Sequence, residues 1–232
     1  SGWTLIAADY SQIELRILAH YSDDEILKDA FIKDEDIHTR TAAEVFQEFP
    51  SFITPDMRRQ AKVINFGIIY GMSPFGLSKE LDISQKMAKN YIDGYFKRYN
   101  KVKLFIDHAI EEARKTGTAS TLLGRKRPIP DIKSSNRNVR MFAERTAVNT
   151  PIQGTAADLI KIAMINVDLA FRKEGLKSAM LLSVHDEIVF ESPPEEVDIV
   201  MDLVEKTMEG VWDLKVPLKV NLASGQNWAD AH

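Results

Sequence analysis

The pattern of apolar and polar positions predicts a strand at the start of the chain and helices after it. Thr4 to Ala8 is a short apolar run that stops abruptly at Asp9, which indicates a buried strand with an acid at its tip. A turn at Tyr10-Ser11 follows, and a helix is expected from about Gln12. Residues 22–112 are mostly helical in pattern, with breaks at prolines and glycines.

The second half of the chain begins irregularly. Between residues 117 and 138, the run Arg125-Lys126-Arg127 and two prolines predict a stiff cationic turn or loop. A long helix is expected from about Asn138, broken at Pro151 and resuming to about Lys173.

Near the C-terminus, two apolar runs flank a polar pair. Residues 179–184 and 187–191 predict two strands joined at His185-Asp186 as a β-hairpin. Such turns prefer Asn-Gly or Asp-Gly. His-Asp is a poor turn sequence, so a requirement other than turn stability is expected to select it.

The segment from Arg58 to Gly71 has an unusual stripe. Thr54-Pro55-Asp56 predicts a helix start, with a capping hydroxyl, proline at the first position and then an acid. Counting by four gives one face roughly 18 Å long, made of Arg58, Lys62, Phe66 and Tyr70. Cations near the helix N-terminus and aromatics beyond them match a nucleoside triphosphate, phosphates first and base second. The alternative is a basic surface helix with core aromatics.

Composition narrows the class of protein. The chain has 232 residues, 44% of them hydrophobic, which can bury the core of one or two domains. Apolar runs fall short of a membrane helix, and the absence of cysteine excludes disulfides and thiolate metal sites. This fits a cytoplasmic or organellar protein.

The net charge of −4 hides two flanks of opposite sign. Residues 114–145 carry nine lysines and arginines and two acids, whereas residues 191–213 carry eight acids and one lysine. A protein that grips a polyanion on one side only would have this distribution. Two solvated helical faces would also produce it.

The two acids at strand tips, Asp9 and Asp186, suggest metal chemistry. A lone aspartate at a strand end is usually a cap or turn residue. If the two strands are neighbours in one sheet, however, the carboxylates meet at its edge. Hard oxygen ligands without His or Cys partners suit Mg²⁺, and two such ions would drive nucleotidyl transfer onto a hydroxyl. A two-metal nuclease also needs acids, but it has no use for the Arg58–Tyr70 stripe.

Other polar positions leave alternatives open. His38 could cap a helix over residues 39–46, lie in the core or contact phosphate. Asn149 and Gln153, near Arg145, are amides that could read groove edges while the arginine contacts phosphate.

Several stretches together resemble family A DNA polymerases, the bacterial DNA polymerase I type. These are Asp9-Tyr10-Ser11-Gln12-Ile13-Glu14-Leu15-Arg16, Arg58-x3-Lys62-x3-Phe66-Gly67-x2-Tyr70-Gly71, Val184-His185-Asp186-Glu187, Gly124-Arg125-x-Arg127-x2-Pro130 and Arg145-x3-Asn149-x3-Gln153-Gly154. The likeness runs from end to end of the chain.

The resemblance implies a role for each matching residue. Asp9 and Asp186 would bind two Mg²⁺ ions, which Mn²⁺ can replace, with Glu187 beside them in support. Lys62 would contact the triphosphate and act as general acid for the leaving pyrophosphate. The residues implied to bind the dNTP are Arg58, Lys62, Phe66, Tyr70, His38, Gln12 and Glu14. Those implied to contact primer and template are Arg145, Asn149, Gln153, His185, Arg125 and Arg127.

The resemblance also implies an α+β fold. A small antiparallel palm sheet with helices packed on it (residues 1–15 and 138–232) would join a mostly helical fingers subdomain (16–137). The thumb, an upstream palm segment and nuclease domains would be absent from this chain, possibly on a separate chain, and the protein would otherwise be a monomer. The alternatives are a DNA-binding fragment inactive by itself and a single-subunit RNA polymerase. Glu14 argues against the latter, because an acid crowding the 2′ position would reject ribonucleotides.

Overall fold

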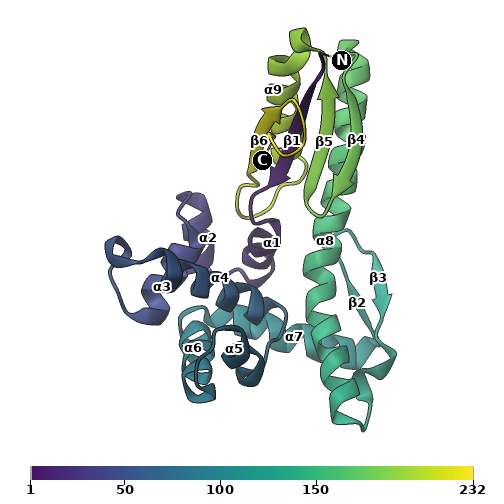
Figure 1. Ribbon diagram of the computed structural model, residues 1–232. Helices are drawn as coiled ribbons and strands as arrows, with labels where there is room; N and C mark the ends of the chain where they lie inside the picture. Colours follow the sequence, from purple (N-terminus) through teal and green to yellow (C-terminus); the bar gives the residue numbers. More distant parts are fainter. Residues whose placement is uncertain (1, 232) are drawn as a thin grey trace. The chain divides into compact units, whose positions relative to one another are not determined.

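The computed structural model describes residues 2–231, which form two compact units (Figure 1). The first unit joins the N-terminal residues up to Ile17 with the chain from Thr155 onward, and the second is Leu18–Gly154. The unit boundary at 154/155 lies inside a helix, whereas the sequence places the second fingers–palm boundary at 137/138. The assignment of palm and fingers stays a prediction.

The first unit is built on a four-stranded antiparallel sheet. In the order β4-β5-β1-β6, its strands are Ala179–Val184, Glu187–Ser192, Thr4–Tyr10 and Val220–Gly225. The predicted hairpin is confirmed, because β4 and β5 are joined by the two residues His185 and Asp186 alone. The first strand is longer than predicted and includes Asp9.

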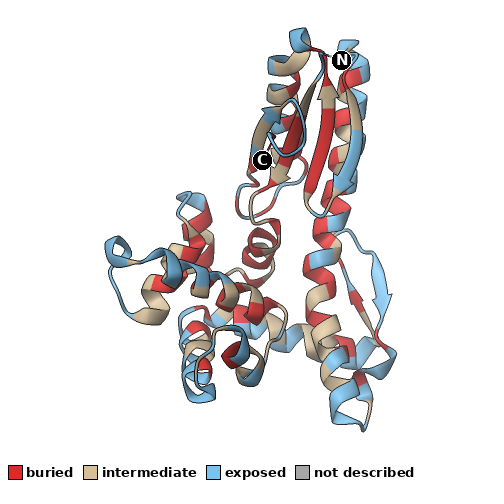
Figure 2. Ribbon diagram, in the orientation of Figure 1, coloured by how far each residue is buried: buried red, intermediate tan, exposed pale blue. Residues whose placement is uncertain are grey.

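One face of this sheet is the core of the first unit. Ile6 lies opposite Phe190 and Ala8 lies opposite Ile188, and all four side chains are buried. The buried parts of the strands are red in Figure 2. The second half of α8 (Arg137–Glu174) packs here through Phe171, whose ring lies 5.7 Å from that of Phe190. Helix α9 (Val197–Glu209) covers the same face, because its Met208 carbonyl accepts a 2.8 Å hydrogen bond from the hydroxyl of Tyr10. A short 3-10 turn (Pro194–Glu196) precedes α9.

The C-terminal segment lies against the sheet at β6. A Cβ on Gly225 would fall 2.6 Å from the backbone of Asp230, so only glycine permits this close approach. Hydrogen bonds from the backbone N–H groups of Asp230 and Ala231 to the Asn227 carbonyl fold the segment on itself. Leu5 is the β1 partner of Gly225.

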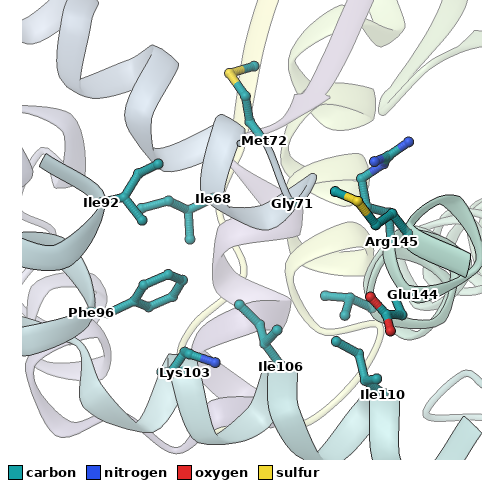
Figure 3. A pocket seen from close by; sticks show the side chains of 12 residues that line it. Ile68, Gly71, Met72, Ile92, Phe96, Lys103, Ile106, Ile110, Glu144 and Arg145 are labelled. Atoms are coloured by element: carbon teal, nitrogen blue, oxygen red, sulfur yellow. The ribbon is translucent and has the colours of Figure 1, made fainter. Parts of the chain in front are cut away.

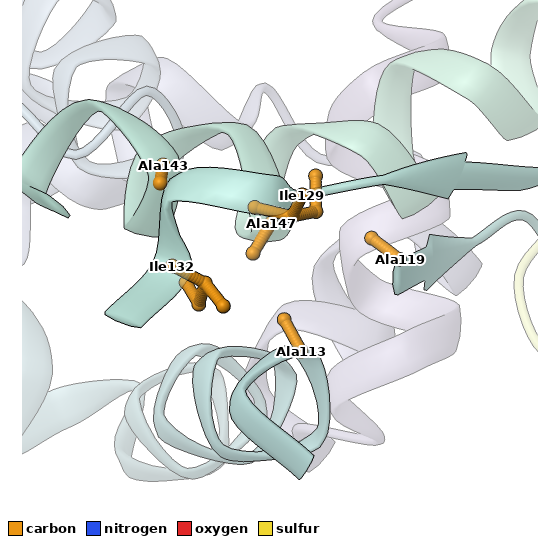
Figure 4. Close-up of a cluster of buried hydrophobic side chains, with 6 residues drawn as sticks. All are labelled: Ala113, Ala119, Ile129, Ile132, Ala143 and Ala147. Carbon is orange, nitrogen blue, oxygen red and sulfur yellow. The ribbon is translucent and has the colours of Figure 1, made fainter. Parts of the chain in front are cut away.

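The second unit is mostly helical. Its helices are the end of α1 (Ile13–Ser22), α2 (Glu25–Ile32), α3 (Ile37–Phe46), α4 (Pro55–Ile69), α5 (Pro74–Glu80), α6 (Gln85–Arg98), α7 (Asn100–Thr116) and the first half of α8, with 3-10 turns at Pro50–Phe52 and Pro130–Lys133. Each of α4, α5 and α6 begins with a Thr or Ser whose hydroxyl accepts a backbone N–H. Small side chains let α7 and α8 approach the segment between them (Figure 4), in a cluster of Ala113, Ala119, Ile129, Ile132, Ala143 and Ala147.

The middle of the chain differs from the expectations in two places. The predicted cationic loop contains a small hairpin of β2 (Thr118–Ser120) and β3 (Lys126–Pro128), whose strands are only three residues long and lack apolar alternation. Helix α8 is not broken at Pro151 but continues through it. The flanking residues Val148 and Ile152 are buried, so packing offsets the backbone hydrogen bond that proline removes.

The predicted α+β class is confirmed by the antiparallel sheet and the helices that accompany it. Within residues 2–231, no helix combines the length and the apolar character needed to cross a membrane.

Candidate active site

The predicted acids Asp9, Asp186 and Glu187 lie at one end of the sheet in the first unit. Strands β1 and β5 are neighbours, which is the condition under which the sequence would bring Asp9 and Asp186 together. Asp9 lies directly opposite Glu187, and such pairs share one face with their Cβ atoms about 5 Å apart. The backbone N–H of Tyr10 donates a 3.1 Å hydrogen bond to the carbonyl of Asp186. The backbone thus brings three acids to one end of the β1–β5 pair.

The turn that carries Asp186 has a strained backbone. His185 has φ 54°, the positive value that two-residue hairpin turns need at their first central position. A residue other than glycine is disfavoured there by about 1 kcal/mol or more. This conformation agrees with the inference that the His-Asp pair is not selected for turn stability.

Glu187 is held by a residue that sequence reasoning missed. Its side chain is buried, and its Oε1 accepts a 2.9 Å hydrogen bond from the indole Nε1 of Trp228. Trp228 belongs to the C-terminal segment that folds against the sheet. The two residues are 41 positions apart, and a lone tryptophan after the last strand carries no signal of this contact.

Arg16, which ends the first motif but had no role assigned from the sequence, fixes the turn between β1 and α1. Arg16 is buried, and its guanidinium donates to the carbonyls of Ser11 (2.8 Å) and Pro217 (2.7 Å). Gln12, at φ 53°, lies in this turn, and Glu14 is in the first turn of α1. Arg16 therefore holds the backbone from which Gln12 and Glu14 project.

The acids of the first unit suit a hard divalent ion. Within residues 2–231, no group of three or more His, Cys, Asp or Glu side chains has the arrangement of a metal site. Mg²⁺ needs fewer protein ligands than that, because it keeps several waters and takes one or two carboxylates with substrate phosphates. Asp9 is only partly buried, as a ligand to such an ion must be.

The second set of predicted residues lies on α4 in the second unit. Its N-terminus is as predicted, with Thr54 accepting a hydrogen bond from Met57 N–H and Pro55 in the first turn. Arg58 and Lys62 are exposed, and the rings of Phe66 and Tyr70 stack at 6.2 Å with 17° between their planes.

The opposite face of α4 is apolar. Ala61, Ile64 and Ile68 are buried there. The stripe of cations and aromatics thus lies away from this core face, and Tyr70 ends the helix as its C-cap.

Asp36, which sequence reasoning also missed, orders Arg58. Its carboxylate caps α3 by accepting from His38 N–H, and it pairs with the Arg58 guanidinium through Nε and Nη2. Burial raises the pKa of Asp36, but hydrogen bonds from Arg58 and Thr39 outweigh it, so the pKa lies below the usual range for aspartate. Asp36 therefore remains charged and links α3 to α4.

His38 lies in the core of the second unit, and the side chain that caps α3 is that of Asp36. Only 2% of His38 is exposed, its ring centroid lies 5.9 Å from that of Phe66, and its Nδ1 is 3.0 Å from Asn65 Nδ2. Burial lowers the pKa of His38 from 6.5 to about 4; Asp36 opposes this shift, whereas Arg58 and Lys62 add to it.

The predicted DNA contacts of the second unit lie on α8 and on the β2–β3 hairpin. Arg145, Asn149 and Gln153 repeat every four residues and so share one stripe of α8. Arg125 and Arg127 are exposed in the hairpin.

Arg145 is held by close packing against a glycine. A Cβ on Gly71, which has φ 65°, would lie 2.8 Å from the Arg145 side chain. Arg145 also borders a cavity of about 230 Å³, lined mainly by apolar residues including Ile68 and Phe96 (Figure 3). Gly71 is thus required both by its backbone conformation and by its contact with Arg145.

The chain belongs to DNA polymerase family A, whose sequence pattern its residues 1–230 match. Its relatives include bacterial DNA polymerase I: it is 50% identical over 231 residues to that of Bacillus caldotenax and 52% identical over 229 residues to that of Bacillus subtilis. The alignments take in 100% and 99% of this chain but 26% of each relative, so the chain spans about a quarter of their length.

A solved structure is similar over the whole chain. It is the POL domain of Pol1 from M. smegmatis in complex with DNA primer-template and dNTP, with 45% sequence identity and a TM-score of 0.96. The match takes in 100% of this chain and 41% of that one. The resemblance stated from the motifs is confirmed at the level of the family and the fold.

The buried His38 predicts a pH dependence of stability. Above pH 6.5 the ring is neutral in both the folded and unfolded states, so it has no effect. As the pH falls from 6.5 towards 4, the unfolded chain binds a proton that the folded state excludes, and the free energy of unfolding decreases by at most about 3 kcal/mol. His38→Gln should reduce this decrease.

The measurement is urea unfolding of both proteins at several pH values between 4.5 and 7. All three tryptophans lie in the first unit, so far-ultraviolet circular dichroism should be the probe rather than fluorescence. Parallel pH profiles for wild type and His38→Gln would contradict the prediction.

Proposed function

We propose that the chain takes part in template-directed DNA synthesis, the transfer of deoxynucleotides from dNTPs to a primer 3′-hydroxyl in replication and repair. The observation that carries the proposal is its likeness, over the whole chain, to a polymerase domain solved with primer-template and dNTP. The motifs around Asp9, Lys62 and Asp186 support it. The proposed setting is the cytoplasm or an organelle.

In the proposed reaction, Asp9 and Asp186 are the metal ligands, and Glu187 supports them from the position opposite Asp9. Two Mg²⁺ ions bound there, which Mn²⁺ can replace, would supply activation of the 3′-hydroxyl and stabilise the charge on the leaving oxygen. The bond that forms joins the primer oxygen to the α-phosphorus, and the bond that breaks releases pyrophosphate.

The exposed stripe of α4 is the proposed triphosphate site. Arg58, Lys62 and His38 would contact the phosphates, and the Nζ of Lys62 would donate a proton to the leaving pyrophosphate. The stacked rings of Phe66 and Tyr70 would pack against the sugar and base. A cationic helix N-terminus followed by an aromatic pair supports this order of contacts.

The proposed DNA contacts come from both units. Arg145, Asn149 and Gln153 would read the minor groove and backbone, and Arg125 and Arg127 would contact phosphates. His185 would contact the primer end, and Gln12 would contact the nucleotide or primer. The exposed hairpin supports a phosphate role for its arginines.

A second candidate function follows from the small share of its relatives' length that the chain spans. Because the chain spans 26% of its relatives and 41% of the similar polymerase domain, the 232 residues by themselves could bind primer-template without extending it. Residues of a longer polymerase, in the same or a separate chain, would then complete the activity.

Loss of Asp186 should abolish extension of a primed template by dNTPs and Mg²⁺, because one of two metal ligands is removed. The test protein is this chain joined to the upstream part of Bacillus subtilis DNA polymerase I, and the change is Asp186→Ala. Asp202→Ala, an exposed acid of α9, is the matched control and should keep full activity.

Retained extension in Asp186→Ala would rule out the metal assignment. The 232-residue chain is measured in parallel for primer-template binding and for incorporation. Binding without incorporation by this chain would favour the second candidate.

Glu14 is expected to help the protein select deoxyribonucleotides over ribonucleotides. The proposed crowding of the 2′ position by Glu14 and Tyr70 would exclude a ribose hydroxyl. In the same joined protein, Glu14→Ala should raise the ratio of ribonucleotide to deoxynucleotide incorporation by roughly tenfold or more. An unchanged ratio would remove Glu14 from the sugar selection.

A further inference from the structure

The second unit contains a buried chain of three polar side chains, of which only His38 has a proposed role. Thr41 on α3 is fully buried, and its hydroxyl donates a 3.1 Å hydrogen bond to Asn65 Oδ1 on α4. Asn65 is 1% exposed, and its Nδ2 lies 3.0 Å from His38 Nδ1. A buried amide between two defined partners is a specific arrangement, because each unpaired polar atom there would cost about 1–3 kcal/mol.

The structure places Asn65 Oδ1 beside the Thr41 hydroxyl and the amide NH₂ beside His38. With Oδ1 occupied as an acceptor, the group that faces His38 is the NH₂, which can only donate. His38 Nδ1 must therefore accept, and so it carries no proton. In the neutral imidazole the single proton then lies on Nε2.

We infer that Asn65 is a positioning residue that fixes His38 in the Nε2-protonated tautomer, so that His38 offers an N–H donor to the triphosphate. The identity of the ligand as a triphosphate rests on the proposed function. The tautomer of His38 is inferred from the hydrogen bonds alone. Asn65 acts through His38 and contacts no nucleotide.

The surroundings of the ring are those of an anion site. His38 is only 2% exposed but lies against Phe66, and the charges of Arg58 and Lys62 both act on its ring, so the buried imidazole is next to the stripe of α4. Asp36 is the acid that acts on it and is itself paired with Arg58. Between two cations, a neutral donor adds a directed hydrogen bond to phosphate without a further buried charge.

The buried state of the imidazole agrees with this assignment. Burial, Arg58 and Lys62 lower the pKa of His38 to about 4, so the ring is neutral near pH 7. Protonation at Nδ1 would also place an N–H against the amide N–H of Asn65. A neutral imidazole with a free choice of tautomer would present an acceptor to phosphate part of the time, and two acceptors repel.

The direct test is ¹⁵N–¹H correlation spectroscopy of the complete chain labelled at its five histidines, with His38→Gln used to assign the His38 signals. At pH 7 the wild type should show an unprotonated Nδ1 and a protonated Nε2. A proton on Nδ1 in the wild type would overturn the inference, with no variant needed.

Asn65→Asp provides the matched perturbation. A carboxylate of nearly the same shape can only accept, so it should move a proton onto Nδ1 and raise the pKa of His38. Thr41→Ser should leave the wild-type tautomer, because it keeps the hydroxyl. Ser78→Ala, which removes a buried hydroxyl bonded to the Phe75 carbonyl on α5, should also leave the tautomer unchanged.

The role in nucleotide binding is measured by titrating the labelled proteins with dATP and Mg²⁺. In the wild type the His38 Nε2 signal should shift, and Asn65→Asp should weaken dATP binding about tenfold or more, as loss of one hydrogen bond to a charged group predicts. The loss of dATP affinity in Asn65→Asp should also vary with pH between 5 and 8. Ser78→Ala should bind dATP with the affinity of the wild type.

Unchanged dATP affinity in Asn65→Asp, despite a switched tautomer, would overturn the positioning role. Because binding is read without catalysis, failure of primer extension in the joined protein would count against the proposed function and not against this inference.

Discussion

The antiparallel pairing of β1 with β5 is the constraint on which the candidate active site depends. The two strands pair without interruption from Thr4–Ser192 to Asp9–Glu187. Ile6 and Ala8 fix this register, because a slip of one residue would turn them out of the core and turn Asp9 into it. The apolar residues that stabilise the sheet thereby also determine which face carries the acids.

Helix α4 must likewise bury one side while it exposes site residues on another, and it does so with the helical repeat instead of the two-residue alternation of a strand. Its buried side packs Ala61, Ile64 and Ile68, whereas Arg58 and Lys62 remain exposed. A helix can serve both purposes only if the two sets follow separate stripes, and the spacing of four provides this. Asn65 is the exception, since it is a polar residue on the buried side, and its partners on α3 explain it.

Local patterns in the sequence predicted much of the fold and most of the candidate site. The hairpin around His185-Asp186, the N-terminus of α4 and its stripe all depend on residues close together in the chain, and the structure contains each of them. Predictions failed where packing overrode a local preference, as at Pro151 in α8.

Contacts between distant residues could not be predicted. The hydrogen bond of Trp228 to Glu187 spans 41 positions, that of Asn65 to His38 spans 27, and that of Arg16 to Pro217 spans 201. Each of these hydrogen bonds forms only when the fold brings two segments together. No local pattern in the sequence around either residue predicts it. The residues expected to do chemistry are therefore easier to find in the sequence than the residues that hold them in place.

The central claim is that Asp9 and Asp186 share divalent ions at the end of the β1–β5 pair. The most direct measurement is a crystal structure of this chain grown with Mn²⁺, with the ions located by their anomalous scattering. Manganese should be bound by a carboxylate oxygen of Asp9 and one of Asp186, each about 2.0–2.3 Å from the metal. Carboxylates too far apart to bind a common pair of ions, or manganese bound only elsewhere, would contradict it.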